Sequence, residues 1–218
     1  IGTDELALID PGPADAAHLA AILRAAGPHP IRHILLTHTH HDHLDGLAEL
    51  RAATGARTYG YGRTVAAAAR PDRPSGAEAS TVDFRPDVAL RDGDMMRFAG
   101  HALEAVFTPG HAPDHLCFAL AGTGILFSGD HVMSWNTSVV APPEGNMAQY
   151  MDSLGKLRDR ASVDTLLLPG HGGRLEQPAR MVRAFIVHRT WREQAILEAI
   201  RDGHTTITRI VAVVYRGL

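Results

Sequence analysis

The sequence has one cysteine, one lysine and no apolar run long enough to cross a bilayer. A single thiol, Cys117, excludes a disulfide framework and a cysteine-rich zinc module. Because no run approaches about 18 apolar residues, neither a transmembrane helix nor a membrane partner is expected. The formal net charge is −3, whereas a protein that coats nucleic acid is usually basic. These absences leave a globular protein whose chemistry rests on other residue types.

The composition is that of one large domain or of one domain with a small appendage. The chain has 218 residues, of which 45% are hydrophobic and 21% charged, an ordinary balance for a globular protein. It begins without Met inside the apolar run Glu5–Ile9, and no signal-peptide pattern is present. We therefore expect a clipped start and a cytoplasmic location.

Apolar periodicity predicts a mixed α/β chain with a strand-rich middle. The predicted strands are Glu5–Ile9, Ile31–Thr37, Arg57–Tyr61, Met96–Phe98, Leu103–Thr108, His115–Leu120, Ile125–Ser128 and Thr165–Leu168. The predicted helices are Ala14–Ala26, Leu44–Thr54, Asn146–Arg160, Arg180–Asp202 and Ile207–Tyr215. The segment Arg70–Ser80 is rich in Pro, Gly and Ser and is predicted to be a loop.

The charge balance changes near Gly173. Residues 1–173 carry 13 Arg and Lys against 20 Asp and Glu, a net charge of −7, and residues 174–218 carry 8 against 4, a net charge of +4. The acidic part is mixed in its predicted elements, and the basic part is helical. We therefore predict a catalytic domain over residues 1–175 and a small helical extension over residues 176–218.

Histidine is unusually frequent, with fourteen residues, five of which fall between His33 and His43. Imidazole is the commonest metal ligand, so this clustering favours a metal site. Four predicted strands also run into a metal-binding residue, namely His38, His111, Asp130 and His171. Loops at one rim of a sheet can converge. The recurrence predicts that these four side chains meet in space.

The segment His38–His43 has the spacing of a metal-binding loop. In an extended stretch, His38 and His40 point the same way and can bind one cation. A turn into a helix near residue 42 would direct Asp42 and His43 toward a second position. Catalytic zinc takes three protein ligands and keeps an open position for water. The seven candidate ligands are therefore His38, His40 and His111 for one ion, Asp42, His43 and His171 for the other, and Asp130 as a bridge.

Several other residues have two open interpretations. His115 and His131 follow candidate ligands and either support them or are structural. Trp135 either lines a substrate pocket or packs in the core. The Arg pairs of the extension, Arg180 with Arg183 and Arg189 with Arg192, either meet an anion or form a solvated helix face. Tyr150 lies on a helix that could face the site, His41 is expected to point away into solvent, and Cys117 is expected to be a core thiol.

The pattern His38-x-His40-x-Asp42-His43, followed by His111, Asp130 and His171, resembles the metallo-β-lactamase superfamily with a glyoxalase II-like metal motif. Asp10, after the first predicted strand, matches that superfamily's first motif, whose Asp usually supports the metal loop. The resemblance implies a four-layer αβ/βα sandwich, a dinuclear metal site at one edge, and a metal-dependent hydrolase. The Cys ligand of some true lactamases is replaced here by Asp130.

The sequence of the extension points to one group within this superfamily. His188-Arg189, Trp191-Arg192-Glu193 and Ile207–Tyr215 resemble the winged-helix-like extension of the lactamase-like protein 2 group. A mitochondrial member of that group is an endoribonuclease. The tail stops before a wing hairpin would be complete, so the extension is expected to be truncated.

The expected activity is that of a hydrolase with two zinc ions. A hydroxide that bridges the ions would attack an ester, thioester or related acyl bond of a small substrate, with Asp42 as the catalytic residue that both ligates and orients it. Iron or manganese are alternatives to zinc, because all the donors are N and O atoms. Oxygenation by a single iron ion is a further alternative that the resemblance implies, because persulfide dioxygenases of the same superfamily have a similar ligand set. A metal-dependent ribonuclease or phosphodiesterase with RNA as its partner is a second possibility. A metal-binding module without catalysis is a third.

Overall fold

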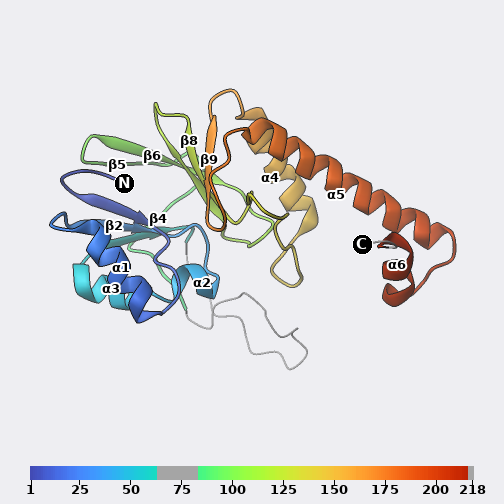
Figure 1. The fold of residues 1–218 in the computed structure, drawn as a ribbon, viewed down its shortest axis with the longest axis horizontal. Coiled ribbons are helices and arrows are strands. Elements are labelled where there is room, and N and C mark those ends of the chain that lie inside the picture. The colour runs from blue at the N-terminus through green and yellow to red at the C-terminus, as the bar shows by residue number, and fades with distance from the viewer. Residues whose placement is uncertain (63–82, 216–218) are drawn as a thin grey trace.

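The computed structural model describes residues 1–62 and 83–215. Its first sheet has four parallel strands in the order β1 (Leu6–Ile9), β2 (Ile31–Leu35), β3 (Arg57–Gly60) and β4 (Val88–Ala89). Parallel neighbours require crossover connections. Helix α1 (Ala16–Ala26) joins β1 to β2, and helix α3 (Leu47–Thr54) lies between β2 and β3. Both helices cover the outer face of this sheet (Figure 1).

The second sheet is mainly antiparallel. Its strands follow the order β5 (Met95–Phe98), β6 (His101–Phe107), β7 (Leu116–Leu120), β8 (Ile125–Gly129) and β9 (Leu166–Pro169). Only β8 and β9 are parallel, and helix α4 (Met147–Asp159) forms their crossover. Helix α4 covers the outer face, together with the first turns of helix α5 (Pro178–Arg201).

Alternation along the strands separates the buried side chains into three layers of core. In β2, Ile34 packs toward the helices and Leu35 packs between the sheets. In β7, Phe118 lies between the sheets, and Cys117 lies on the side of α4 and α5. Successive side chains of a strand point to opposite faces, so a sheet covered on both faces is apolar throughout. The expected four-layer αβ/βα sandwich is confirmed.

The extension consists of helix α5 and helix α6 (Ile207–Val214). The first turns of α5 belong to the main core, because Val182 and Phe185 are buried beside α4. The remainder of α5 projects away from the sandwich, and α6 folds back against α5 (Figure 1). The helices agree with the predicted ranges. The domain boundary and the winged-helix character stay predictions.

One sequence prediction needs correction, and one strand was not predicted. The single helix expected over Leu44–Thr54 is divided into α2 (His41–Leu44) and α3. The break occurs at Gly46, whose amide donates to the carbonyl of Gly12 at 2.9 Å. A Cβ at Gly46 would lie 3.0 Å from the carbonyl oxygen of Pro13 and 3.1 Å from that of Gly12, so this close approach favours glycine. Strand β4 was not predicted, because two residues carry no periodic signal.

The predicted loop Arg70–Ser80 lies outside the described residues. Among the helices that the structure describes, none combines the length and the apolar character needed to cross a bilayer.

Candidate metal centre

The loop after β2 gives the candidate ligands their directions. The chain stays extended as far as His40 (φ −70°, ψ 152°), and α2 begins at the next residue. His38 and His40 therefore point to the same side, as predicted from alternation. The helical turn redirects Asp42 and His43, and it leaves His41 exposed to solvent.

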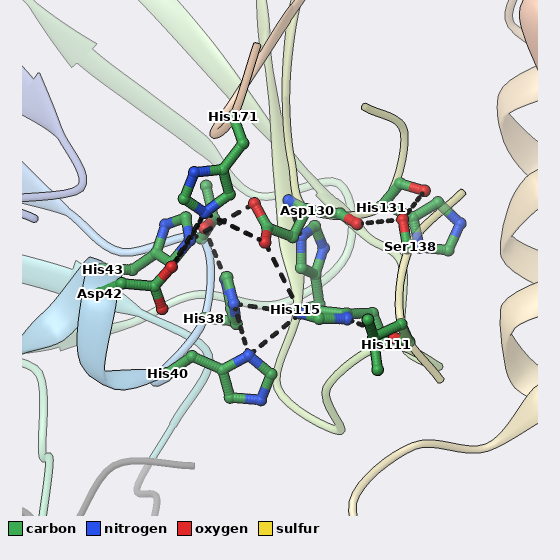
Figure 2. A network of polar contacts seen from close by, with 12 residues as sticks. His38, His40, Asp42, His43, His111, His115, Asp130, His131, Ser138 and His171 are labelled. Atoms are coloured by element: carbon green, nitrogen blue, oxygen red, sulfur yellow. Dashed lines mark hydrogen bonds and ion pairs between the residues drawn. The ribbon is translucent and has the colours of Figure 1, made fainter. Parts of the chain in front are cut away.

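His38, His40 and His111 form a buried trio of imidazoles (Figure 2). His38 Nε2 lies 3.0 Å from His40 Nδ1, and His111 Nε2 lies 3.0 Å from His40 Nδ1 and 3.3 Å from His38 Nε2. Each residue of the buried trio is less than a tenth exposed. Three nitrogens bound to one tetrahedral zinc ion at about 2.0–2.1 Å would be about 3.3 Å apart. The spacing of the buried trio fits such an ion.

Hydrogen bonds fix the tautomers of His38 and His111 in the buried trio. His111 Nδ1–H donates to the carbonyl of Val139 at 2.6 Å, so its Nε2 carries a lone pair. Thr37 Oγ1 donates to Asp10 at 2.8 Å and therefore accepts from His38 Nδ1–H at 2.9 Å. Thus His38 Nε2 also carries a lone pair. Two lone pairs directed at each other across 3.3 Å repel unless a cation lies between them.

Asp42, His43 and His171 form a second group, the open trio. His171 Nε2 lies 2.9 Å from Asp42 Oδ2 and 3.3 Å from His43 Nε2. The side chains of Asp42 and His171 are 31% and 38% exposed, whereas that of His43 is only 3% exposed. The open trio therefore borders on solvent, where a substrate can reach it.

Asp130 lies between the two trios (Figure 2). Its Oδ1 is 3.4 Å from His43 Nε2, and its Oδ2 is 3.5 Å from His171 Nε2 and 4.0 Å from His111 Nε2. Although Oδ1 is buried, it accepts no hydrogen bond from the described residues. A buried carboxylate oxygen without a donor is costly unless a cation is near. The chain leaves space for this carboxylate at Gly170, where a Cβ would lie 2.5 Å from Oδ1.

Asp10 supports both trios from behind. Its Oδ1 accepts from the amide of Thr37 at 2.8 Å, and its Oδ2 accepts from Thr37 Oγ1 at 2.8 Å and His43 Nδ1 at 2.9 Å. Asp10 has a left-handed backbone (φ 53°), a conformation that Asp tolerates better than most residues. The structure thus gives Asp10 the supporting position that the family motif implies.

The trios differ in charge as well as in exposure. Burial, followed by the charge of His40, lowers the pKa of His111 to about 4. Burial, followed by the charge of His43, lowers the pKa of His38 far below its usual value. Burial also disfavours a charged His43, but the carboxylates of Asp10 and Asp130 raise its pKa to about 11. Burial opposes ionisation of Asp42, but the hydrogen bond from His171 and the charge of His43 hold its pKa well below its ordinary value. These shifts favour neutral rings at His38 and His111 and charged groups at His43 and Asp42.

His115 and His131 adopt different roles. His115 Nε2 accepts from the amide of Asp130 at 3.1 Å, and its Nδ1–H donates to Thr108 Oγ1 at 2.9 Å. It therefore positions the backbone of a candidate ligand. The ring of His131 is fully buried against Tyr150, and neither nitrogen has a hydrogen-bond partner among the described residues. Burial lowers the pKa of His131 to about 3.

The loop between Asp130 and Asn146 contains the positioning groups that the sequence did not single out. Ser138 Oγ donates to the carbonyl of Asp130 and, at 2.9 Å, to that of His131. Glu144 lies 3.5 Å from His40 Nε2. Trp135 is 73% exposed, and a Cβ at Gly172 would lie 2.9 Å from its Cδ1. Core packing does not explain Trp135, which lies against the loop that carries His171.

The comparison with known families agrees with this fold and site. The sequence model of the Metallo-beta-lactamase superfamily matches residues 1–171. The chain therefore belongs to the metallo-β-lactamase superfamily.

Individual relatives refine this assignment. The chain is 32% identical over 203 residues to the lactamase-like protein adaB of Aspergillus niger, covering 92% of this chain and 57% of that protein. It is 34% identical over 199 residues to the beta-lactamase-like protein 2 homolog of Drosophila melanogaster, covering 88% and 63%. The second match supports the resemblance to the lactamase-like protein 2 group. This chain spans less than two thirds of either relative.

The fold also matches a solved structure over nearly the whole chain. A metallo-beta-lactamase family protein from Thermus thermophilus superposes with a TM-score of 0.77 at 25% identity. The superposition covers 98% of this chain and 80% of the other. The match includes the extension as well as the sandwich.

Proposed function

We propose that this protein is a dinuclear zinc hydrolase that cleaves an ester, thioester or related acyl bond of a small substrate. The observation that carries the proposal is the pair of adjoining trios with Asp130 between them. The donors are five imidazoles and two carboxylates, a set that suits zinc, with iron and manganese as the alternatives. The buried trio (His38, His40 and His111) would hold one ion. The open trio (Asp42, His43 and His171) would hold the other, and Asp130 would bind both.

Two zinc ions, when bound, would supply a hydroxide at neutral pH and would polarise a substrate carbonyl. The chain's own residues hold and orient the reacting groups. Asp10 and Thr37 fix the rings of His43 and His38, and the carbonyl of Val139 fixes that of His111. Outer hydrogen bonds of this kind fix the orientation of ligating rings.

Asp42 is the residue that we assign to the attacking water. Its carboxylate is partly exposed and lies beside solvent, whereas Asp130 is buried. Because the pKa of Asp42 lies well below its ordinary value, the group stays ionised at neutral pH. It therefore orients water by accepting a hydrogen bond, and it does not need to take up the proton.

A panel of substrates tests the reaction class. An acyl-glutathione thioester, an acyl-CoA, a lactone, a β-lactam, a phosphodiester and RNA are each incubated with protein loaded with zinc, iron or manganese, and with chelator-stripped protein. We expect hydrolysis of an acyl substrate by the zinc protein, loss on stripping, and recovery when zinc is returned.

Two outcomes would contradict this proposal. Salt-dependent RNA cleavage without acyl hydrolysis would favour a ribonuclease, because phosphate contacts release counterions. Tight metal binding without turnover of any substrate would favour a non-catalytic metal-binding module.

A further inference from the structure

Arg189 lies on the face of α5 that packs against the sandwich. It follows Val182 and Phe185, which are 1% and 7% exposed, at helical spacing. After Val182 and Phe185, this face of the helix therefore continues with a guanidinium group. The cation is not part of a solvated helix face, which was one of the two interpretations open from the sequence.

The guanidinium group of Arg189 contacts the loop beside the metal centre. Its Nη2 donates to the carbonyl of Ser138. Its Cζ lies 5.4 Å from the centre of the Tyr150 ring, close enough for a cation–π contact. The hydroxyl of Tyr150 donates to the carbonyl of His131 at 3.0 Å. Both contacts lead from α5 to the segment that carries Asp130.

The peptide held by Arg189 adjoins the groups that orient two candidate ligands. The carbonyl after Ser138 is that of Val139, which accepts from His111 Nδ1–H at 2.6 Å. The hydroxyl of Ser138 donates to the carbonyl of Asp130. A displacement of the Ser138 peptide would therefore change the tautomer and direction of His111 and the position of Asp130 together.

We propose that Arg189 is a positioning residue that ties helix α5 to the metal centre through the Ser138–Val139 peptide. The extension would then contribute to the affinity of the metal centre. The inference rests on the proposed metal centre, and it assigns to Arg189 no contact with substrate. Groups that orient metal ligands from outside typically change affinity by about 10–100-fold when they are removed.

The test compares Arg189→Met, which removes the donors and keeps an apolar stem, with Arg189→Lys, which keeps a charge and a shorter donor. The control is Arg183→Met, because Arg183 is exposed six residues earlier on the same helix. Zinc affinity is measured by competition with a chelating dye. The visible spectrum of the Co²⁺-loaded protein reports the ligand geometry. The unfolding temperature of the metal-free protein reports the fold.

We expect Arg189→Met to weaken binding at the buried trio by about 10–100-fold and to alter the Co²⁺ spectrum. Arg189→Lys should show a smaller loss, and Arg183→Met should match the unmodified protein. If Arg189→Met does not fold, the loss in Arg189→Lys decides the question.

A lower unfolding temperature with unchanged zinc affinity and spectrum in Arg189→Met would reduce Arg189 to a structural contact and overturn the inference. If Arg189→Met does not fold, an unchanged zinc affinity in Arg189→Lys would also overturn the inference. If the unmodified protein binds no transition metal, the proposed function fails and this inference fails with it. If it binds metal and the Arg189 variants bind equally well, only this inference fails.

Discussion

The two trios of the candidate metal centre are built by different physical means. In the buried trio, hydrogen bonds to Thr37 and Val139 orient the rings of His38 and His111. The open trio contains a carboxylate and a His43 whose pKa is raised to about 11 by Asp10 and Asp130, against the effect of burial. The buried trio is held by packing and hydrogen bonds, whereas the open trio is held by interactions between charged groups. The difference suggests that the buried trio gives affinity and the open trio gives access to substrate.

The largest effect is expected from Asp130→Asn, because Asp130 lies beside both trios. A neutral amide cannot offer an anionic oxygen to each of two cations, so both ions should be lost or bound at least about 100-fold more weakly, beyond the usual cost of an outer partner. Elemental analysis after desalting measures this, and far-UV circular dichroism should stay unchanged. Asp152→Asn, on the exposed side of α4, is the control. Two retained equivalents of metal would exclude a shared role for Asp130.

Single-ligand variants should separate the trios. His171→Ala should leave the buried trio intact and retain one tightly bound ion. His111→Ala should lose that ion, and it should also lower the unfolding temperature, because the carbonyl of Val139 loses its donor. Metal titration and thermal unfolding of both variants give the comparison. Equal metal content and equal stability in the two variants would remove the distinction between the trios.

Trp135→Ala should affect substrate and leave the metal in place. Its exposed indole lies beside the loop of His171, on the open side of the site. Loss of an apolar contact worth about 1–2 kcal/mol would raise KM roughly 5- to 30-fold, with kcat and zinc content nearly constant. Trp191→Ala, an exposed Trp on α5, is the matched control. An unchanged KM for every hydrolysed substrate would assign Trp135 no part in binding.

The smallest expected signal comes from Cys117, a fully buried thiol on β7. Its Sγ is 3.3 Å from Thr108 Oγ1, the partner of His115. Burial raises the pKa of this thiol to about 12, so the thiolate fraction at pH 8 is on the order of 10⁻⁴. Iodoacetamide should therefore label the native protein far more slowly than the unfolded protein. Rapid labelling of the native state would show that the Cys117 thiol is accessible to solvent.

The sequence predicts the strands and the convergence of the candidate ligands well, for identifiable reasons, whereas the four-layer sandwich was expected from the family resemblance. Buried strands are apolar, so a His or Asp at their ends stands out, and the alternation from His38 to His40 fixes one direction. The contact of Arg189 with Ser138 could not be predicted, because it joins residues 51 apart through a backbone carbonyl that any residue type supplies. The break at Gly46 was missed because it depends on the approach of the Gly12 turn.

The most direct test of the account is the number of zinc ions that one chain holds at equilibrium. Gently purified protein is dialysed against micromolar zinc, and metal and protein are quantified in the same sample. The account predicts two zinc ions per chain in the unmodified protein and one in His171→Ala. One ion or none in the unmodified protein would contradict the dinuclear centre.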